Sequence, residues 1–357
     1  MVWSFPLLYA GQCASAKEPA LCYGPARNLW EDDMRSVMCR EWGEPSVLKL
    51  EDVAPPKAAP GEVLLDVKAA SVNFADIVMT EGNYQTKPDF PFAPGLEASG
   101  TIAALGQGVT GFAVGDRVLA KLAYGGFADQ AVARVQDTYR VPDGMPWDVA
   151  GAFYVGYVSS HVALRWQGQV EAGQTVLVLG ASGGTGLTAV EISKAMGATV
   201  IAGASSADKL AVATEHGADH GINYRDEDLK ARVNGLTGGE GVDVVFDPVA
   251  GDLFDPALSS LGWGGRYLIF GFVGGIPNIP ANRLLVKHRS AMGCSLRYFT
   301  DKAPEKLAIS MDELFAMYAD GKLKPLISAT YPLERAAEAM EELRQRKATG
   351  RVVVTVS

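Results

Sequence analysis

A glycine-rich turn at residues 175–186 carries the clearest chemical signal in the sequence. The stretch reads TVLVLGASGGTG, so a continuous apolar run leads into seven residues of which four are glycine. The apolar run is typical of a strand buried on both faces of a parallel sheet, and Gly180, Gly183 and Gly186 recur at three-residue spacing where the chain must turn. Glycines let a backbone approach a pyrophosphate, and the free N–H groups at the start of the next helix hold its charge. The pattern therefore predicts a nucleotide-binding turn.

The residues that follow predict the helix and second strand of a βαβ unit. Within 187–198, Ile192 and Met196 fall at four-residue spacing, as on the buried face of a helix. Gly197 is a suitable helix stop, and the next strand reads TVIAGA at 199–204. Spaced glycines alone are a weak signal in a chain with 40 glycines, so this context is what favours nucleotide binding over an ordinary turn.

The end of that second strand indicates which nucleotide is preferred. An NAD-binding unit usually carries an acidic residue about 20 positions along, which holds the ribose 2′-hydroxyl, but no Asp or Glu lies between Glu191 and Asp208. Ser205, Ser206 and Lys209 instead offer hydroxyls and a cation where a 2′-phosphate would sit. We therefore expect NADPH rather than NADH. One of the two serines is also a candidate cap for the following helix, and both roles are compatible.

Length and composition predict two domains and argue against several classes of partner. The 357 residues are 48% hydrophobic, which is enough to fill two cores. A net charge of −9 opposes electrostatic binding to nucleic acid or an anionic membrane, and no apolar run is long enough to cross a bilayer. The four cysteines and four histidines show no metal-ligand spacing, which favours free thiols in a reducing, cytoplasmic compartment and no bound metal. Residues 1–33 read as a flexible extension rather than a secretion signal, because no Lys or Arg precedes their apolar part.

The rest of the pattern predicts an α/β protein with two kinds of sheet. From 35 to 158, short strands separated by Gly and Pro are typical of a mostly antiparallel β domain. A helix at 147–164 leads into the nucleotide unit, whose alternating strands and helices build a doubly wound, parallel Rossmann-type sheet. Its six strands are expected at 175–179, 199–204, 221–224, 242–247, 265–271 and 290–295. Helices at 304–319 and 333–346 and a strand at 351–356 then return to the first domain.

Several strings, in this order and spacing, resemble the medium-chain dehydrogenase/reductase superfamily and, within it, the zinc-independent quinone oxidoreductase family. The strings are ASVNFAD at 70–76, PGLEASG at 94–100, GDRV at 115–118, the glycine turn, and DPVAG at 247–251. The resemblance covers about residues 35–356. It implies a GroES-like catalytic domain at 34–157 and 297–357, and an NADP-binding domain at 158–296.

The resemblance also bears on the chemistry. Zinc-dependent members carry a Cys where this chain has Asn73 and a His where it has Leu96, and neither side chain supplies the thiolate or imidazole of a catalytic zinc site. Hydride transfer without a metal needs an easily reduced acceptor. A quinone meets that need, because hydrogen bonding to the developing oxyanion suffices. We therefore expect NADPH-dependent reduction of a quinone or other conjugated carbonyl.

Individual site residues follow from the same resemblance. Asn73 is expected beside the nicotinamide, with Asp76 and Tyr84 as further catalytic candidates. Tyr84 is the candidate hydrogen-bond donor to the substrate oxygen, and its alternative role is packing at the pocket rim. The implied cofactor contacts are Ser182, Gly183, Gly184, Thr185 and Gly186 at the pyrophosphate, Ser205, Lys209 and Tyr224 at the 2′-phosphate, Ser159, Phe270 and Phe272 near the nicotinamide, and Lys347 elsewhere on the cofactor.

Two other functions stay open at this point. An enoyl thioester or alkenal could accept the hydride, with a basic cluster contacting a coenzyme A phosphate, although these residues could equally cap a helix or line a dimer edge; they are Arg283, Lys287, His288 and Arg289. The chain could instead bind the nucleotide without catalysis. Relatives pair the edge of the nucleotide-domain sheet, here 290–295, so we expect a homodimer, with a tetramer as the open alternative. We expect a small-molecule substrate and neither nucleic acid nor membrane as partner.

Overall fold

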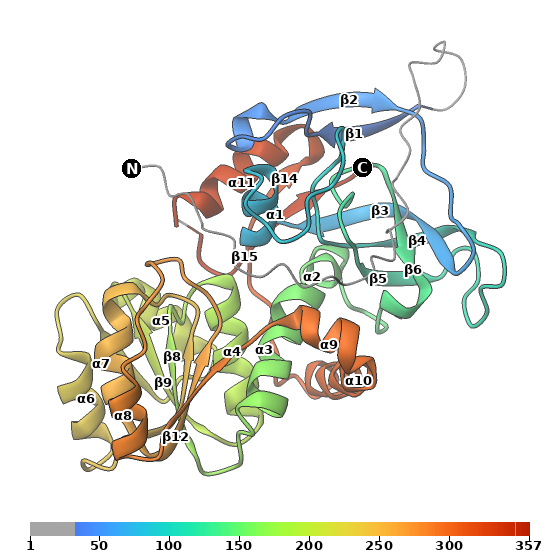
Figure 1. Cartoon of the computed structure of the whole chain (residues 1–357). Coiled ribbons are helices and arrows are strands. Elements are labelled where there is room, and N and C mark those ends of the chain that lie inside the picture. The colour runs from blue at the N-terminus through green and yellow to red at the C-terminus, as the bar shows by residue number, and fades with distance from the viewer. Residues whose placement is uncertain (1–32, 347) are drawn as a thin grey trace.

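The computed structural model describes residues 33–346 and 348–357, in two sheet-based bodies joined by helices (Figure 1). One body contains a six-stranded parallel sheet and the other a seven-stranded, mostly antiparallel sheet. This arrangement confirms the predicted fold class. Nearly all of the predicted extension, and Lys347, lie outside the described residues. Within them, no helix is both long and apolar enough to span a membrane.

The parallel sheet is built from short apolar strands that are buried on both faces. Along β8, Val176 and Val178 pack into one core cluster, whereas Leu177 and Leu179 pack into another. The strands lie in the order β10-β9-β8-β11-β12-β13, and all neighbours are parallel. The order reverses between β8 and β11, where a ligand crevice is expected. The bounds are β8 Thr175–Leu179, β9 Thr199–Ala204, β10 His220–Asn223, β11 Val242–Asp247, β12 Leu261–Ile269 and β13 Ser290–Gly293.

Helices follow most of these strands and cover the sheet. Their bounds are α4 Gly184–Ala195, α5 Ala207–Glu215, α6 Leu229–Leu236, α7 Phe254–Ser259 and α8 Ala281–Val286. The first of them, α4, begins three residues earlier than the apolar pattern predicts, because its first turn consists of Gly184, Thr185 and Gly186 and carries no apolar signal. Strand β13 ends at Gly293 rather than at residue 295. Among the described strands it pairs with β12 alone, so it is the edge of the described sheet.

The antiparallel body is organised around the long strand β3. Its sheet has the order β14-β15-β3-β4-β5-β7, with β6 also pairing β3, and a separate hairpin joins β1 to β2. Only β14 and β15 are parallel in this sheet. The bounds are β1 Met34–Met38, β2 Lys49–Val53, β3 Glu62–Ser71, β4 Glu97–Leu105, β5 Arg117–Lys121, β6 Gln130–Arg134, β7 Thr138–Arg140, β14 Ile327–Pro332 and β15 Arg351–Thr355. Helices α1 Phe74–Thr80 and α11 Ala336–Arg344 complete it.

The segment that joins the bodies is not the single helix predicted at 147–164. It alternates α2 Trp147–Gly151, a π-helical turn at Tyr154–Val158, α3 Ser159–Val162 and a second π-helical turn at Ala163–Gln167. Wide π turns are rare and often occur at functional sites. Here the first one places the backbone N–H of Val155 on the side chain of Glu97 at 2.8 Å, so it connects the two bodies.

The C-terminal helices α9 Leu296–Lys302 and α10 Pro304–Ala319 pack on this joining segment. Helix α10 has the predicted bounds. Its Ser310 accepts a hydrogen bond from Trp166 Nε1 at 3.0 Å, and Leu307 and Leu314 share a core cluster with strands of the parallel sheet. The first element to rejoin the antiparallel sheet is therefore β14, and we propose that the domain boundary lies near residue 325 rather than at 297.

The described chain passes between the two bodies at the joining segment and again just before β14. Both of these crossings bond to one buried carboxylate on α4. Glu191 is 2% exposed and accepts hydrogen bonds from Tyr157 Oη at 2.6 Å and from the backbone N–H of Lys324 at 3.2 Å. His216, at the end of α5, also contacts this carboxylate. Tyr157 belongs to the first crossing and Lys324 to the second. A buried carboxylate needs such partners, so Glu191 holds the crossings against the nucleotide-side helix.

Candidate active site

The glycine turn has the geometry that a phosphate site needs. A Cβ added to Gly186 would lie 2.1 Å from the carbonyl oxygen of Gly180, so only glycine fits there. Gly180 has a φ of +58°, which also favours glycine. Gly183 caps α4 without a side-chain bond, and the N–H groups of the first helical turn have no partner within the helix. These N–H groups, and the positive end of the helix dipole, can hold an anion.

The two serines after β9 have different positions. Ser206 is the N-cap of α5 and accepts a hydrogen bond from the backbone N–H of Lys209 at 3.4 Å. Ser205 lies beside the phenol of Tyr224. Burial raises the pKa of that phenol, and Ser205, Arg225 and Arg346 partly offset the rise. The structure thus brings Ser205 and Tyr224 together.

Two arginines that no sequence motif marks also act on the Tyr224 phenol. Arg225 follows Tyr224, and Arg346 comes from the far end of the chain and donates to the backbone carbonyl of Val273. The predicted contact at this end of the chain is Lys347, which lies outside the described residues. Arg346 adjoins that position, but no local pattern marks an arginine in a charged helix end as a cofactor contact.

The nicotinamide-side residues are spread along the joining segment and the loop after β12. Ser159 is 8% exposed at the start of α3. Phe270 packs on Phe246 with ring centroids 4.8 Å apart, whereas Phe272 is 49% exposed. Arg346 holds this loop through the Val273 carbonyl. Ser159 and Phe270 are therefore fixed by packing, and Phe272 is the exposed member.

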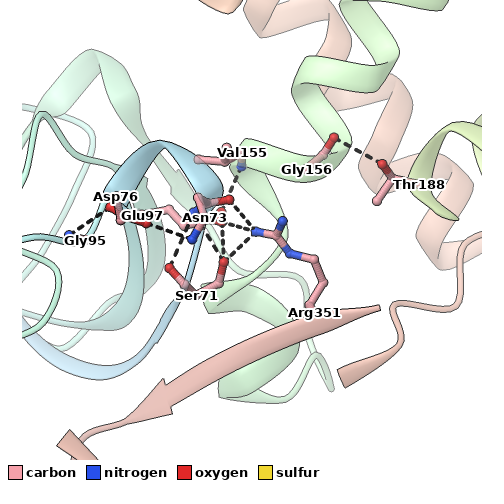
Figure 2. A network of polar contacts seen from close by, with 9 residues as sticks. All are labelled: Ser71, Asn73, Asp76, Gly95, Glu97, Val155, Gly156, Thr188 and Arg351. Carbon is pink, nitrogen blue, oxygen red and sulfur yellow. Dashed lines mark hydrogen bonds and ion pairs between the residues drawn. The ribbon is translucent and has the colours of Figure 1, made fainter. Parts of the chain in front are cut away.

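Asn73 belongs to a buried polar cluster that the sequence argument did not predict (Figure 2). Its Nδ2 donates to Glu97 Oε1 at 3.1 Å, and its Oδ1 accepts from Arg351 Nη2 at 2.8 Å. Ser71 Oγ also donates to Glu97 Oε1, at 2.7 Å. The second oxygen of Glu97 accepts from the N–H of Val155. The amide of Asn73 is thus held in one orientation by protein groups from β3, β4 and β15.

The cluster is organised by an ion pair between Arg351 and Glu97. The atoms Nη2 and Oε1 are 2.6 Å apart, and the two side chains are 7% and 1% exposed. Two charges taken out of water must be paired, because an isolated buried charge is very costly. A signal for both was present in the sequence: Glu97 begins an apolar strand and Arg351 precedes three valines. Each is a lone charge in a stretch that must be buried.

Arg351 also reaches the glycine turn. The backbone N–H of Gly350 donates to Ser182 O at 2.9 Å, and Gly183 forms a β-bridge with Gly350. A Cβ on Gly184 would lie 3.1 Å from Cδ of Arg351. The buried Nε of Arg351 has no hydrogen-bond partner among the described residues. Arg351 therefore links the phosphate-binding turn to the Asn73 side of the site and presents a spare donor beside that turn.

Asp76 has a structural position. It is completely buried, and its two oxygens accept the backbone N–H groups of Asn73 at 2.8 Å and Gly95 at 3.0 Å. Asn73 and Asp76 form a capping box at the start of α1. This geometry does not favour direct contact of Asp76 with substrate. It favours a positioning role, in which Asp76 fixes the loop that carries Asn73.

Tyr84 lines a cavity of about 630 Å³ that also contains Leu96 and Tyr124. Burial raises the pKa of the Tyr84 phenol, the charge of Asp76 raises it further, and Arg297 lowers it. The phenol therefore keeps its proton at neutral pH and can donate a hydrogen bond into the cavity. Arg297, on α9, is another cavity residue that the sequence argument did not name.

We predict that breaking the buried ion pair is strongly destabilising. Arg351→Met leaves Glu97 charged, buried and unpaired, so the free energy of unfolding should fall by about 3–5 kcal/mol. The double variant Glu97→Gln/Arg351→Met should recover part of this loss. Arg335→Met, which removes a surface pair with Glu338, is the control and should cause little change. Urea unfolding measures all three, and a fully stable Arg351→Met protein would contradict the prediction.

We also predict that Asp76 makes stability depend on pH. Burial raises its pKa to about 7, against backbone N–H donors that lower it. Between about pH 4 and pH 7 the folded protein therefore holds a proton that the unfolded chain has released. The proton that Asp76 retains in the folded state stabilises the protein relative to its stability at high pH. This contribution to the free energy of unfolding is up to roughly 4 kcal/mol. It is fully present below about pH 4 and is lost as the pH rises through 7.

Asp76→Asn cannot titrate, so its stability should fall less steeply over this pH range than that of the wild type. Urea unfolding from pH 4 to pH 8 measures both slopes. Asp89→Asn, at an exposed position, is the control and should keep the wild-type slope. Equal slopes for the wild type and Asp76→Asn would show that Asp76 is ionised throughout.

Comparisons with known proteins agree with this geometry. A family model described as "Alcohol dehydrogenase GroES-like domain" matches residues 59–174, and one described as "Zinc-binding dehydrogenase" matches residues 184–312. The second description mentions zinc, whereas the described part of the chain contains no group of three or more His, Cys, Asp or Glu side chains that could hold a metal ion.

Curated relatives match nearly end to end. "Quinone oxidoreductase-like protein 2" of Rattus norvegicus is 34% identical over 346 residues, which is 96% of this chain and 98% of that protein. The Homo sapiens "Quinone oxidoreductase" is 32% identical over 324 residues, which is 90% of this chain and 97% of that protein.

A solved structure of the Escherichia coli quinone oxidoreductase complexed with NADPH is also similar. Its TM-score is 0.83 at 29% identity, and the match covers 90% of this chain and 99% of that chain. A Pseudomonas syringae quinone oxidoreductase has a TM-score of 0.84 at 31% identity, with the same coverage. The two family models, the relatives above 30% identity and the shared fold lead to one conclusion: the chain is an oxidoreductase that belongs to the quinone oxidoreductase family of the medium-chain dehydrogenase/reductase superfamily.

Proposed function

We propose that the chain catalyses NADPH-dependent reduction of a quinone by hydride transfer without a metal. The observation that carries this proposal is which residues occupy the two positions where zinc-dependent members have zinc ligands. Asn73 is held by Glu97 and Arg351, and Leu96 is an apolar residue of the cavity wall. Neither supplies a zinc ligand, so the acceptor must be one that hydrogen bonds alone can activate.

The phosphate-binding features of the chain fit NADPH. Backbone N–H groups of Ser182–Gly186 would hold the pyrophosphate, and the spare Nε donor of Arg351 lies beside them. Ser205, Lys209 and Tyr224 would hold the 2′-phosphate, with Arg346 adding positive charge. When bound, NADPH supplies the hydride. Binding of NADPH by the similar Escherichia coli enzyme supports this assignment.

The substrate-side residues would orient the acceptor and stabilise its charge. Tyr84 keeps its proton because burial raises its pKa, so its hydroxyl can donate to an oxygen that gains negative charge. Asn73 would contact the nicotinamide side of the site, and Asp76 would hold the backbone of that loop. Ser159, Phe270 and Phe272 would pack around the nicotinamide, which keeps water away from the reacting atoms.

The geometry disfavours the coenzyme A thioester alternative. Arg283 donates to Asp255 at 2.9 Å, and Arg289 donates to backbone carbonyls of Ser259, Leu261 and Gly262. These guanidinium groups are therefore engaged by the chain itself. They belong to α8 and the segment after it, at the far end of the parallel sheet from α1 (Figure 1).

The proposal is tested by following NADPH oxidation with a panel of acceptors. We expect turnover of 1,4-benzoquinone and 9,10-phenanthrenequinone that is insensitive to a chelator, and a reduced kcat with Tyr84→Phe. Turnover of crotonyl thioester or an alkenal alone would move the function to reduction of an activated carbon–carbon double bond. Tight NADPH binding with no acceptor reduced would indicate a non-catalytic nucleotide-binding protein.

The 2′-phosphate assignment predicts a selective cofactor effect. Lys209→Ala removes a cation from the first turn of α5, which Ser206 caps. The KM for NADPH should therefore rise roughly 10- to 100-fold, which is the range for losing a hydrogen bond to a charged group. The KM for NADH should not change. Lys230→Ala, at an exposed position of α6, is the control. Equal effects of Lys209→Ala on both cofactors would place the 2′-phosphate elsewhere.

We propose a homodimer that pairs the sheet edge β13. The supporting observation is an apolar surface on and before the adjacent α8, where Leu285 is 83%, Val286 70% and Ile276 67% exposed. An unpaired edge strand beside large apolar side chains is a liability that association removes. Sedimentation velocity should give a dimer for the wild type and a monomer for Leu285→Glu. A wild-type monomer at micromolar concentration would contradict the proposal.

We also propose a cytoplasmic location. Cys39 and Cys294 are both free thiols, and burial raises the pKa of each, to about 11 and about 12. Protonated, unpaired thiols suit a reducing compartment. Fractionation of cells that express the full chain tests this location.

A further inference from the structure

The cavity that contains Tyr84 is larger than the reduction of a small ring requires. It measures about 630 Å³ and lies between loops of the antiparallel body and helix α9. Figure 1 shows α9 at the junction of the two bodies. Cavities of ~300–1,000 Å³ enclose drug-sized ligands. We call its two parts the inner end, with Tyr84, Leu96 and Tyr124, and the outer end, with Ala54, Pro55, Pro56, Ala59, Val132 and Ala133.

The inner end adjoins the polar cluster that holds Asn73. Leu96 directly precedes Glu97, the carboxylate that holds Asn73. The charge of Asp76 raises the pKa of Tyr84. Tyr124 packs edge-on against the buried ring of Phe92, with ring centroids 6.1 Å apart. A reacting ring would therefore lie at the inner end. The outer end would then contact another part of the substrate that carries this ring.

The outer end offers apolar contact and little hydrogen bonding. Pro55 and Pro56 have no backbone N–H to donate. Val132 and Ala133 belong to β6, whose residues pair with β3 in the sheet. The outer end thus offers small aliphatic side chains, and the charged groups of Lys57, Glu62, Arg134 and Asp137 line the cavity beside them.

The charges around the cavity are largely balanced by one another. Arg134 pairs with Asp137 at 2.6 Å, and Arg297 pairs with Asp301 at 3.2 Å. Glu62 accepts the backbone N–H of Ala59 at 2.9 Å. In total the lining contains four cations and three carboxylates. A polyphosphate such as that of coenzyme A would need a clear excess of positive charge, which these pairs do not leave.

We propose that the outer end binds an aliphatic substituent of the substrate, so that the natural acceptor is a conjugated carbonyl ring with an alkyl or isoprenoid chain. This inference rests on the proposed function for the position of the ring. The chain would run from Tyr84 and Leu96 toward Pro55 and Pro56 and would be held by burial of its methylene groups.

A chain-length series tests the proposal. Benzoquinones with no substituent and with methyl, butyl and decyl chains are compared as acceptors, together with 2-alkenals of matched length. Burying methylene groups should lower the KM of wild-type protein by roughly twofold or more per methylene over the first several groups. Calorimetric binding of the same quinones to the protein with NADP⁺ gives this comparison without turnover.

A blocking variant and a matched control locate the effect. Ala54→Trp places a large ring at the outer end, so it should remove the advantage of the long chain. Ala58→Trp, four residues along the same loop at a position that does not line the cavity, should keep the wild-type dependence on chain length.

The outcomes separate the two proposals. A chain-length advantage that Ala54→Trp abolishes and Ala58→Trp retains would support the outer end as an alkyl site. The same result with alkenals alone, and no quinone reduced, would support the site while refuting quinone reduction. Affinity that is independent of chain length, or a strong preference for a coenzyme A thioester over every alkyl acceptor, would overturn the inference.

Discussion

The buried ion pair between Glu97 and Arg351 is the interaction on which the geometry of the site depends. Both side chains are almost fully removed from water, so each charge must be satisfied by protein groups. Satisfying Glu97 recruits Ser71, Asn73 and the backbone of Val155. One carboxylate thereby holds β3, β4, β15 and the joining segment in a single arrangement. The position of Asn73 is a consequence of this charge balance.

The same pair places the cofactor side relative to the substrate side. The residue before Arg351, Gly350, bonds to the glycine turn through Ser182, while the guanidinium of Arg351 bonds to Asn73. A shift of β15 would therefore move both sides together. Glu191 acts in a similar way further along α4, because it binds both chain crossings at once. Two buried carboxylates thus set how the bodies meet, which suits a reaction between two molecules bound on opposite sides.

Particular residues show how far prediction from sequence could go. The strands at 199–204 and 242–247 and the helix at 304–319 have the predicted bounds, because each has a strong apolar period and clear end signals. The segment at 147–164 was predicted as one helix, since π turns have no distinct composition. Asp76 is a catalytic candidate from the sequence, whereas the structure places it in a capping box and buries it completely, because its burial depends on what packs over α1.

The sequence alone determined the features that depend on neighbouring residues. These are the glycine turn, the absence of an acidic residue after the second strand, and the replacement of zinc ligands by Asn73 and Leu96. Only the tertiary structure decided which distant groups meet: Arg351 with Glu97, and Arg346 with Tyr224. The reason is physical. A turn or a cap is fixed by short-range backbone geometry, whereas the partner of a buried charge is fixed by the packing of strands that lie hundreds of residues apart.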